Sequence, residues 1–154
     1  MKYLYEFIGT FFLVATIGMV VVQPGAAPLG FAPLAIGTVL AVMIFAGGHV
    51  SGGHYNPAVS LAVFLRGDKR EFTITEMLIY WVVQLVAGFL AALVVMYLKG
   101  ALAAGGTDPV SVPTVNLGAV MLPALIAEFL GTFALTYTVL NVATAKATSG
   151  NSFY

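Results

Sequence analysis

The chain has 154 residues, of which 60% are hydrophobic and 8% charged, whereas an ordinary soluble domain has about 45–50% apolar and about 25% charged residues. This composition excludes a conventional water-soluble fold. Six basic and six acidic residues give a formal net charge of zero, and no run of Lys or Arg is long enough to follow a phosphate backbone, so we expect no nucleic-acid partner. Cysteine is absent, which excludes disulfides and thiolate chemistry.

Four apolar segments are long enough to cross a bilayer, because a helix of about 20 residues spans the hydrocarbon layer. These segments cover residues 4–22, 31–47, 74–98 and 117–143. The connections at 23–30 and 100–116 are rich in glycine and proline, which is typical of turns and loops. The sequence therefore predicts an all-α membrane protein whose residues 1–154 form one membrane domain embedded in the lipid bilayer.

A shorter segment, residues 49–65, follows the second span and does not fit the pattern of a full crossing. Its first part, together with Gly47 and Gly48, contains four glycines and Pro57, which disfavour a continuous helix. Residues 58–65 can be helical, but eight residues rise only about 12 Å. A cluster of charges at 66–71 comes directly afterwards and indicates a membrane surface. We therefore expect a re-entrant hairpin that enters and leaves by the same face.

The distribution of basic residues predicts the orientation, since cytoplasmic loops carry the excess of Lys and Arg. With a cytoplasmic amino terminus and a re-entrant hairpin, five basic residues lie inside and Lys99 alone lies outside. The five are Lys2, Arg66, Lys69, Arg70 and Lys146. A hairpin that crossed the bilayer would weaken this bias. We expect a multi-pass protein of the cell membrane with its amino terminus in the cytoplasm.

The chain also contains an internal repeat. Residues 6–13 and 128–135 are identical at six of eight positions, at an offset of 122 residues. Three spans separate the two copies, so the second copy enters the bilayer from the opposite face, as in the inverted repeats of transport proteins. Residues 1–116 then form the first repeat and residues 117–154 begin a second. Position 56 of the first repeat would correspond to position 178, beyond Tyr154, so the fold is expected to be truncated after the fourth span.

The hairpin carries the chemistry. Asn56 suits the N-cap of a helix and Pro57 its first position, so a short helix would direct its positive dipole end into the membrane. The amide of Asn56 offers two N–H donors, and an extended segment before it presents carbonyl acceptors. That segment is Gly52, Gly53, His54 and Tyr55. Donors at the centre and acceptors leading to them suit a neutral molecule that forms hydrogen bonds.

Other interpretations of these residues predict different chemistry. Asn56 could be a simple N-cap without a role in permeation. His49 and His54 could bind a metal, although two histidines without a nearby carboxylate or cysteine fall short of a usual ligand set. Ser51 beside His54 lacks the motif and the acid of a hydrolase. We expect no metal, no cofactor and no enzymatic step, and we expect the two histidines to bond to the loop backbone.

The string from His49 to Ser60, HVSGGHYNPAVS, closely resembles the first signature loop of the aquaporins, or major intrinsic proteins. The repeated Glu-Phe-x-Gly-Thr-Phe resembles the start of each half of that fold. The resemblance implies an aquaporin-like inverted-repeat helix bundle with a re-entrant half-helix. It implies a passive channel for water, with glycerol or other small neutral solutes as further permeants, and a homotetramer at full length.

The resemblance also implies roles for individual residues. Asn56, Pro57 and Ala58 would form the first half of the pore centre, and the carbonyls of residues 52–55 would form its cytoplasmic ladder. Glu6 and Glu128 would be buried anchors, each bonded to the re-entrant loop of its own half, and His49 would support the loop.

Two departures from the family pattern affect this implication. The second Asn-Pro-Ala loop, the arginine beside it and the last two spans are not in the sequence, so we expect the chain alone to be inactive as a pore. Ile36 occupies the place, 20 residues before Asn56, where the family often has an aromatic side chain. An aliphatic group there leaves the choice between water and a larger solute open.

Two other functions are compatible with the sequence. Ionisable groups inside a membrane are candidates for proton coupling, so Glu6 and Glu128 could serve a carboxylate-coupled secondary transporter. Alternatively, the chain could be a half-channel that associates with itself, or a purely structural membrane subunit.

Overall fold

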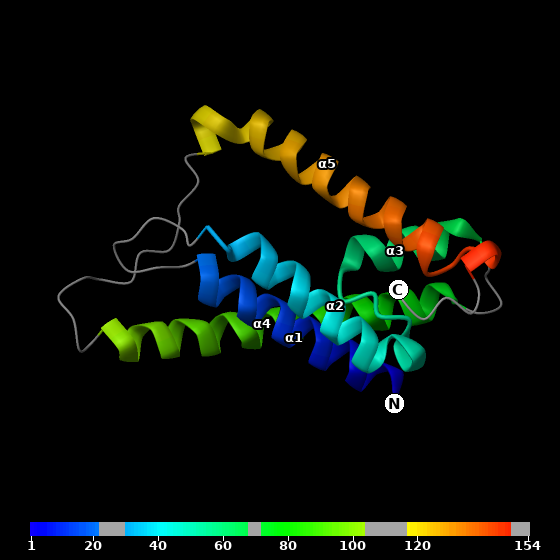
Figure 1. The fold of residues 1–154 in the computed structure, drawn as a ribbon, viewed down its shortest axis with the longest axis horizontal. Coiled ribbons are helices and arrows are strands. Elements are labelled where there is room, and N and C mark those ends of the chain that lie inside the picture. The colour runs from blue at the N-terminus through cyan, green and yellow to red at the C-terminus, as the bar shows by residue number, and fades with distance from the viewer. Residues whose placement is uncertain (22–29, 68–71, 104–116, 149–154) are drawn as a thin grey trace.

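The computed structural model describes residues 1–21, 30–67, 72–103 and 117–148 (Figure 1). Four predicted features lie wholly or largely outside these residues: the turn at 23–30 except for residue 30, most of the charged cluster at 66–71, most of the loop at 100–116 and the end of the polar tail. Over the described ranges the chain is helical without strands, which confirms the all-α fold. The helices are α1 (Lys2–Val21), α2 (Ala32–Ser51), α3 (Pro57–Arg66), α4 (Ile74–Ala103), α5 (Leu117–Val142) and the short 3₁₀ helix η1 (Lys146–Thr148).

Four of these helices are long and apolar enough to cross a membrane, as predicted. The candidate spans are Lys2–Val21, Ala32–Ser51, Ile74–Gly100 and Met121–Val142. Most of their large apolar side chains are exposed, as a lipid-facing surface requires. The ten-residue α3 is too short to cross the membrane.

Helix α1 packs along both α2 and α4, and α3 contacts α4 and α5. Small residues allow this close approach: Ala87 and Ala91 of α4 are fully buried, and a Cβ at Gly18 would lie 2.9 Å from Val95. Figure 1 shows α5 set apart from α1 and α2, reaching the rest of the molecule at α3. The core therefore lies between the first three spans.

The hairpin returns to the end of the bundle from which it starts. Figure 1 shows the end of α2, the end of α3 and the start of α4 at the same end of the molecule, with the amino terminus beside them. The loop between α2 and α3 reaches back toward the middle of the bundle. Figure 1 also shows α1 and α5 running in opposite directions, which is the arrangement expected of the two copies of the repeated motif.

Helix α2 continues further than the sequence predicts. It was expected to end near residue 47, but it includes Gly47, Gly48 and His49 and ends at Ser51. Packing outweighs the low helix propensity of glycine here, since Gly47 is buried and a Cβ on it would lie 2.6 Å from the hydroxyl oxygen of Tyr55.

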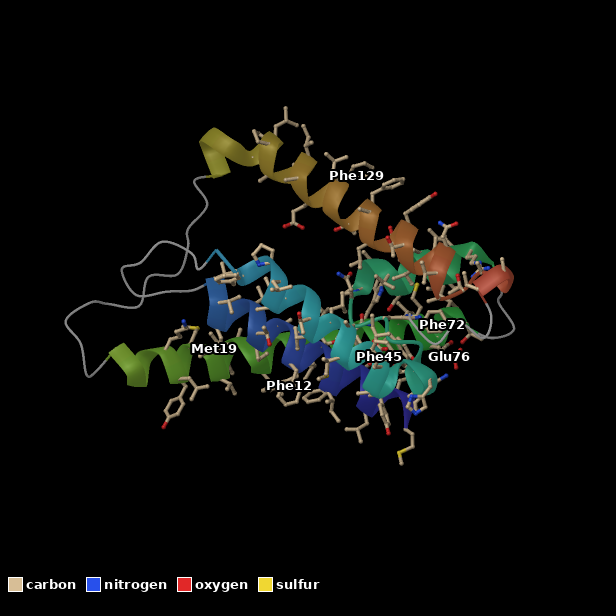
Figure 2. The ribbon with its side chains drawn as sticks, viewed as in Figure 1. Phe12, Met19, Phe45, Phe72, Glu76 and Phe129 are labelled. Carbon is tan, nitrogen blue, oxygen red and sulfur yellow. The ribbon has the colours of Figure 1, made fainter. Side chains whose placement is uncertain are left out.

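Helix α1 is joined to α4 at both ends. Lys2 forms a salt bridge with Glu76 in the first turn of α4. At the other end, Lys99 Nζ donates to the backbone oxygen of Met19 at 2.8 Å. Figure 2 shows Glu76 and Met19 at opposite ends of the helix pair. Lys99 was predicted to follow the third span as an external charge, but it lies within α4 and is only 7% exposed.

Candidate functional site: the re-entrant loop

The loop between α2 and α3 depends on left-handed backbone conformations. Gly52 caps α2 with a φ of 89°, and Gly53 follows with a φ of 64°. Glycine adopts these angles without the Cβ clash of other residues. Tyr55 has a φ of 47°, and among the described residues it is the one non-glycine residue with a positive φ. Such a conformation costs of order 1–3 kcal/mol and persists only where surrounding contacts impose it.

Glu6 supplies the main contacts that hold the loop. Its carboxylate is completely buried and accepts four hydrogen bonds. The Oε1 atom accepts from Ser51 Oγ at 2.8 Å and from the backbone N–H of His54 at 2.9 Å. The Oε2 atom accepts from the backbone N–H of Tyr55 at 2.7 Å and from Gln84 Nε2 at 2.9 Å. One side chain of α1 thus fixes the end of α2, two loop amides and a side chain of α4.

Helix α4 secures the loop from the other side. Tyr80 donates its hydroxyl hydrogen to the backbone oxygen of Ser51 at 2.7 Å, and Gln84 Nε2 also donates to Ser60 Oγ at 3.1 Å. Trp81 Nε1 donates to the backbone oxygen of Pro57 at 2.9 Å. These bonds fix both ends of the loop, including the first residue of α3.

His54 is buried inside this arrangement. Its Nδ1 lies 3.1 Å from Ser60 Oγ, and its ring meets the rings of Phe72 and Tyr80 edge-on at centroid distances of 4.9 and 5.2 Å. Burial lowers the pKa of His54 below its ordinary value, because the charged imidazolium is poorly solvated there. His54 is therefore neutral at physiological pH.

Asn56 begins α3 with its side chain in a defined orientation. Its backbone is extended, with φ −153° and ψ 130°, and its Oδ1 accepts from the backbone N–H of Ala58 at 2.8 Å. The capping bond uses the amide oxygen and leaves the two Nδ2 hydrogens as donors. Pro57 occupies the first helical position, where its missing N–H is harmless.

A groove of about 340 Å³ lies beside Asn56 between α1 and α4. It is mainly apolar, and Tyr55, Asn56 and Pro57 of the loop form one part of its wall. Thr10 of α1 and Gln84 of α4 are also among the residues that line it. A neutral molecule in this groove meets an amide donor at the amino-terminal end of a helix, where the positive dipole end disfavours cations.

The sequence matches a known family along nearly its whole length. A family model described as "Major intrinsic protein" matches residues 1–153. The chain belongs to this family.

Individual relatives agree with this assignment. The chain is 33% identical to aquaporin NIP3-1 of Arabidopsis thaliana over 170 residues, which cover 97% of the chain and 47% of that protein. It is 32% identical to nodulin-26 of Glycine max over 155 residues, covering 97% and 53%. It is also 32% identical to glycerol uptake facilitator protein-like 6 of Lactiplantibacillus plantarum over 143 residues, covering 92% and 62%. The chain thus spans about half the length of the curated relatives it matches.

Two residues with expected roles, His49 and Ile36, lie outside the network around Glu6. His49 belongs to the last turn of α2, where its side chain is exposed and its ring meets Tyr5 at 6.4 Å. It is not placed to support the loop, because α2 is longer than predicted. Ile36 is half-buried on α2 and is not part of the groove wall beside Asn56.

Glu128 also differs from its expected burial. It is exposed on α5, in a second groove of about 470 Å³ between α3 and α5. Ala58 of the Asn-Pro-Ala motif lies on the opposite wall of this groove. No loop segment among the described residues covers Glu128 as residues 51–55 cover Glu6, which explains the difference in exposure.

Sequence reasoning did not identify Gln84, Tyr80, Ser60 or Trp81 as part of the site. All but Ser60 come from α4, which reads as a uniformly apolar span apart from these polar groups. The sequence does contain an indication of the role of Gln84, because it is the one amide side chain in an otherwise apolar segment from residue 77 to 98. A buried amide in a span needs hydrogen-bond partners, and Gln84 Nε2 has two of them, Glu6 of α1 and Ser60 of α3. Within the described residues, no cluster of His, Asp or Glu suits a metal ion.

Proposed function

We propose that this chain forms half of a passive membrane channel that conducts water past Asn56. The observation that carries the proposal is the orientation of the Asn56 amide. Its oxygen is bonded to the N–H of Ala58, so only its N–H groups are available to a molecule in the groove. A water molecule at this point would donate its own hydrogens elsewhere, to the loop carbonyls of residues 52–55.

In this mechanism the loop replaces the hydrogen bonds that water loses on leaving bulk solvent. Water accepts from Asn56 Nδ2 and donates to a carbonyl, so one molecule follows another without a covalent step. The positive end of the α3 dipole raises the energy of a cation at the same position. The protein acts as a channel and not as an enzyme, and it needs no cofactor or metal.

Water is the first candidate permeant, and small neutral solutes such as glycerol are the second. Hydroxyl groups of a polyol can use the same donor and acceptors as water. The name of the Lactiplantibacillus plantarum relative mentions glycerol uptake, while other relatives are named aquaporins. Ile36 lies where the family often has an aromatic side chain at its constriction, and this aliphatic residue leaves the choice between the two permeants open. We propose that Glu6 anchors this half of the channel and that Glu128 anchors the corresponding loop of a second half.

The proposal includes an orientation and an assembly. Lys2 is the first residue of α1 and Arg66 the last of α3. The start of α1, the end of α3 and the start of α4 lie at the same end of the bundle (Figure 1), and by the positive-inside rule this end faces the cytoplasm of the cell membrane. The resemblance to the family favours a homotetramer in which each subunit of full length has its own pore.

Osmotic shrinkage of liposomes tests the proposal in two forms of the protein. The first is the 154-residue chain alone. The second is the chain continued by the carboxyl-terminal half of glycerol uptake facilitator protein-like 6. We expect the first to match protein-free liposomes, since one half-helix makes half a pore, and the second to shrink rapidly. Asn56→Asp should slow the second form about fivefold or more, because aspartate keeps the cap but removes the donors.

Three results would contradict this account. Rapid shrinkage with the 154-residue chain, together with cross-links between two copies near Asn56, would favour a self-associating half-channel. Uptake that needs a pH gradient and is lost in Glu6→Gln would indicate a coupled transporter. A continued chain that folds but conducts no faster than bare lipid would remove the channel proposal.

A further inference from the structure

The side chain of Tyr55 has no part in the pathway proposed above. That pathway uses the backbone carbonyl of this residue, while the side chain is only 3% exposed. A phenol group is nevertheless large for a loop of five residues, and burying its hydroxyl costs free energy unless the hydroxyl forms a hydrogen bond. Its surroundings show what it contacts.

The ring of Tyr55 fits between α1 and α2 at two glycines. The three atoms nearest to a Cβ built on Gly9 all belong to the Tyr55 ring and would overlap with it. A Cβ on Gly47 would lie 2.6 Å from the hydroxyl oxygen of Tyr55. Neither helix could carry a larger residue at these positions without moving the ring, so the slot requires glycine on both sides.

Both ends of Tyr55 are also bonded to these helices. Its backbone N–H donates to Glu6 of α1 at 2.7 Å, and its hydroxyl donates to the backbone oxygen of Met43 of α2 at 2.8 Å. The residue is therefore fixed at its backbone, along its ring and at its tip. These contacts oppose the unfavourable φ of 47° that the loop requires at this position.

We propose that Tyr55 is a positioning residue: its side chain joins α1 to α2 and holds the strained loop so that the carbonyls of residues 52–55 and the Asn56 amide stay in line. An aliphatic residue could fill part of the slot, but it could not bond to Met43. The consequence for conduction rests on the proposed function, whereas the structural role does not.

A double-mutant cycle tests the slot in the 154-residue chain. Gly9→Ala should lower the midpoint of thermal unfolding by about 4 °C or more, because the new methyl group displaces the ring. In a Tyr55→Ala background the same change should have little further effect, since the ring is gone. Gly131→Ala is the matched control, at the equivalent position of the repeat, where a Cβ would have no atom of the described part of the chain within 4 Å. Equal losses from Gly9→Ala in both backgrounds would overturn the proposal.

The hydroxyl is tested by Tyr55→Phe, which keeps the ring. Hydrogen exchange of the His54 and Tyr55 amides should become about fivefold faster, as expected for one lost hydrogen bond, while exchange within α4 stays unchanged. Tyr137→Phe is the control, because that side chain is 61% exposed on α5. Unchanged exchange at both loop amides would overturn the role of the hydroxyl.

The continued chain described above then separates the two proposals. Tyr55→Phe should lower its water permeability while leaving its helix content unchanged, a result that a purely structural contact would not give. Unchanged permeability, with faster exchange in the loop, would overturn the positioning role but leave the channel intact. If no variant conducts, the channel proposal fails, and the exchange and unfolding measurements still decide whether Tyr55 holds the loop.

Discussion

Residues 6–13 and 128–135 have nearly the same sequence, but the structure places them in different surroundings. Glu6 is fully buried and accepts four hydrogen bonds, whereas Glu128 is exposed. Gly9 lies against a tyrosine ring, whereas a Cβ on Gly131 would meet no atom of the described residues within 4 Å. The motif thus supplies a carboxylate that accepts hydrogen bonds and a glycine that leaves space for a ring. Both are used only where a loop packs against the helix. Matched substitutions in the two copies measure how much the loop contributes.

The largest expected difference concerns the two glutamates. Glu6→Gln should lower the free energy of unfolding by about 2–4 kcal/mol, because the new amide nitrogen faces donors and leaves buried N–H groups unpaired. Glu128→Gln changes an exposed side chain and should shift it by less than about 0.5 kcal/mol. Denaturation in detergent micelles, followed by circular dichroism, measures both values. Equal losses would mean that Glu128 is also engaged, and the contrast between the copies would disappear.

The sequence predicted the helices well because composition and length determine them in a membrane. The four spans and the short helix after Asn56 begin and end within about five residues of the expected positions. The hairpin followed from glycine content and from the charge cluster after it. The boundary at the end of α2 was wrong, since the fit of Gly47 against Tyr55 is a tertiary contact that a propensity argument does not contain.

The partners within the site were harder to predict. Glu6 and Gln84 are 78 residues apart, and nothing in either local sequence specifies that they meet. The role of Glu6 came from a resemblance and not from periodicity. The exposure of Glu128 shows the limit of that approach, because a motif match transfers a residue type and not the segment that would surround it.

A second, smaller effect concerns the two polar links between α1 and α4, one at each end of α1. Lys99→Met should destabilise the protein by about 2 kcal/mol, because it removes a charged hydrogen bond from the last turn of α1. Lys2→Met should cost about 0.5 kcal/mol, since its salt bridge with Glu76 is partly exposed to solvent. Micelle unfolding of both variants checks the order. A larger loss for Lys2→Met would place the main link between α1 and α4 at the amino-terminal end.

The smallest expected effect has the opposite sign and concerns the threonines of the motif. Thr10 is 4% exposed, and its hydroxyl oxygen has no hydrogen-bond partner within the described residues, whereas Thr132 is partly exposed at the equivalent position of α5. Replacing a buried hydroxyl that lacks a partner by a methyl group removes a desolvation cost. Thr10→Val should therefore raise the free energy of unfolding by about 1 kcal/mol, and Thr132→Val should leave it nearly unchanged.

The sign of the Thr10→Val effect decides what the groove beside Asn56 contains. A gain means that the hydroxyl is enclosed by apolar groups and that the loop is held by Glu6 and Tyr55 without it. A loss means that the hydroxyl has a partner, either ordered water or a segment outside the described residues. The same groove contains Gln84 and Asn56, so a partner for Thr10 would lie close to the proposed pathway. Measuring Thr10→Val in the 154-residue chain and in the continued chain locates the partner: a loss in the continued chain alone would place it in the added half, and a loss in both forms would place it in ordered water or within residues 1–154.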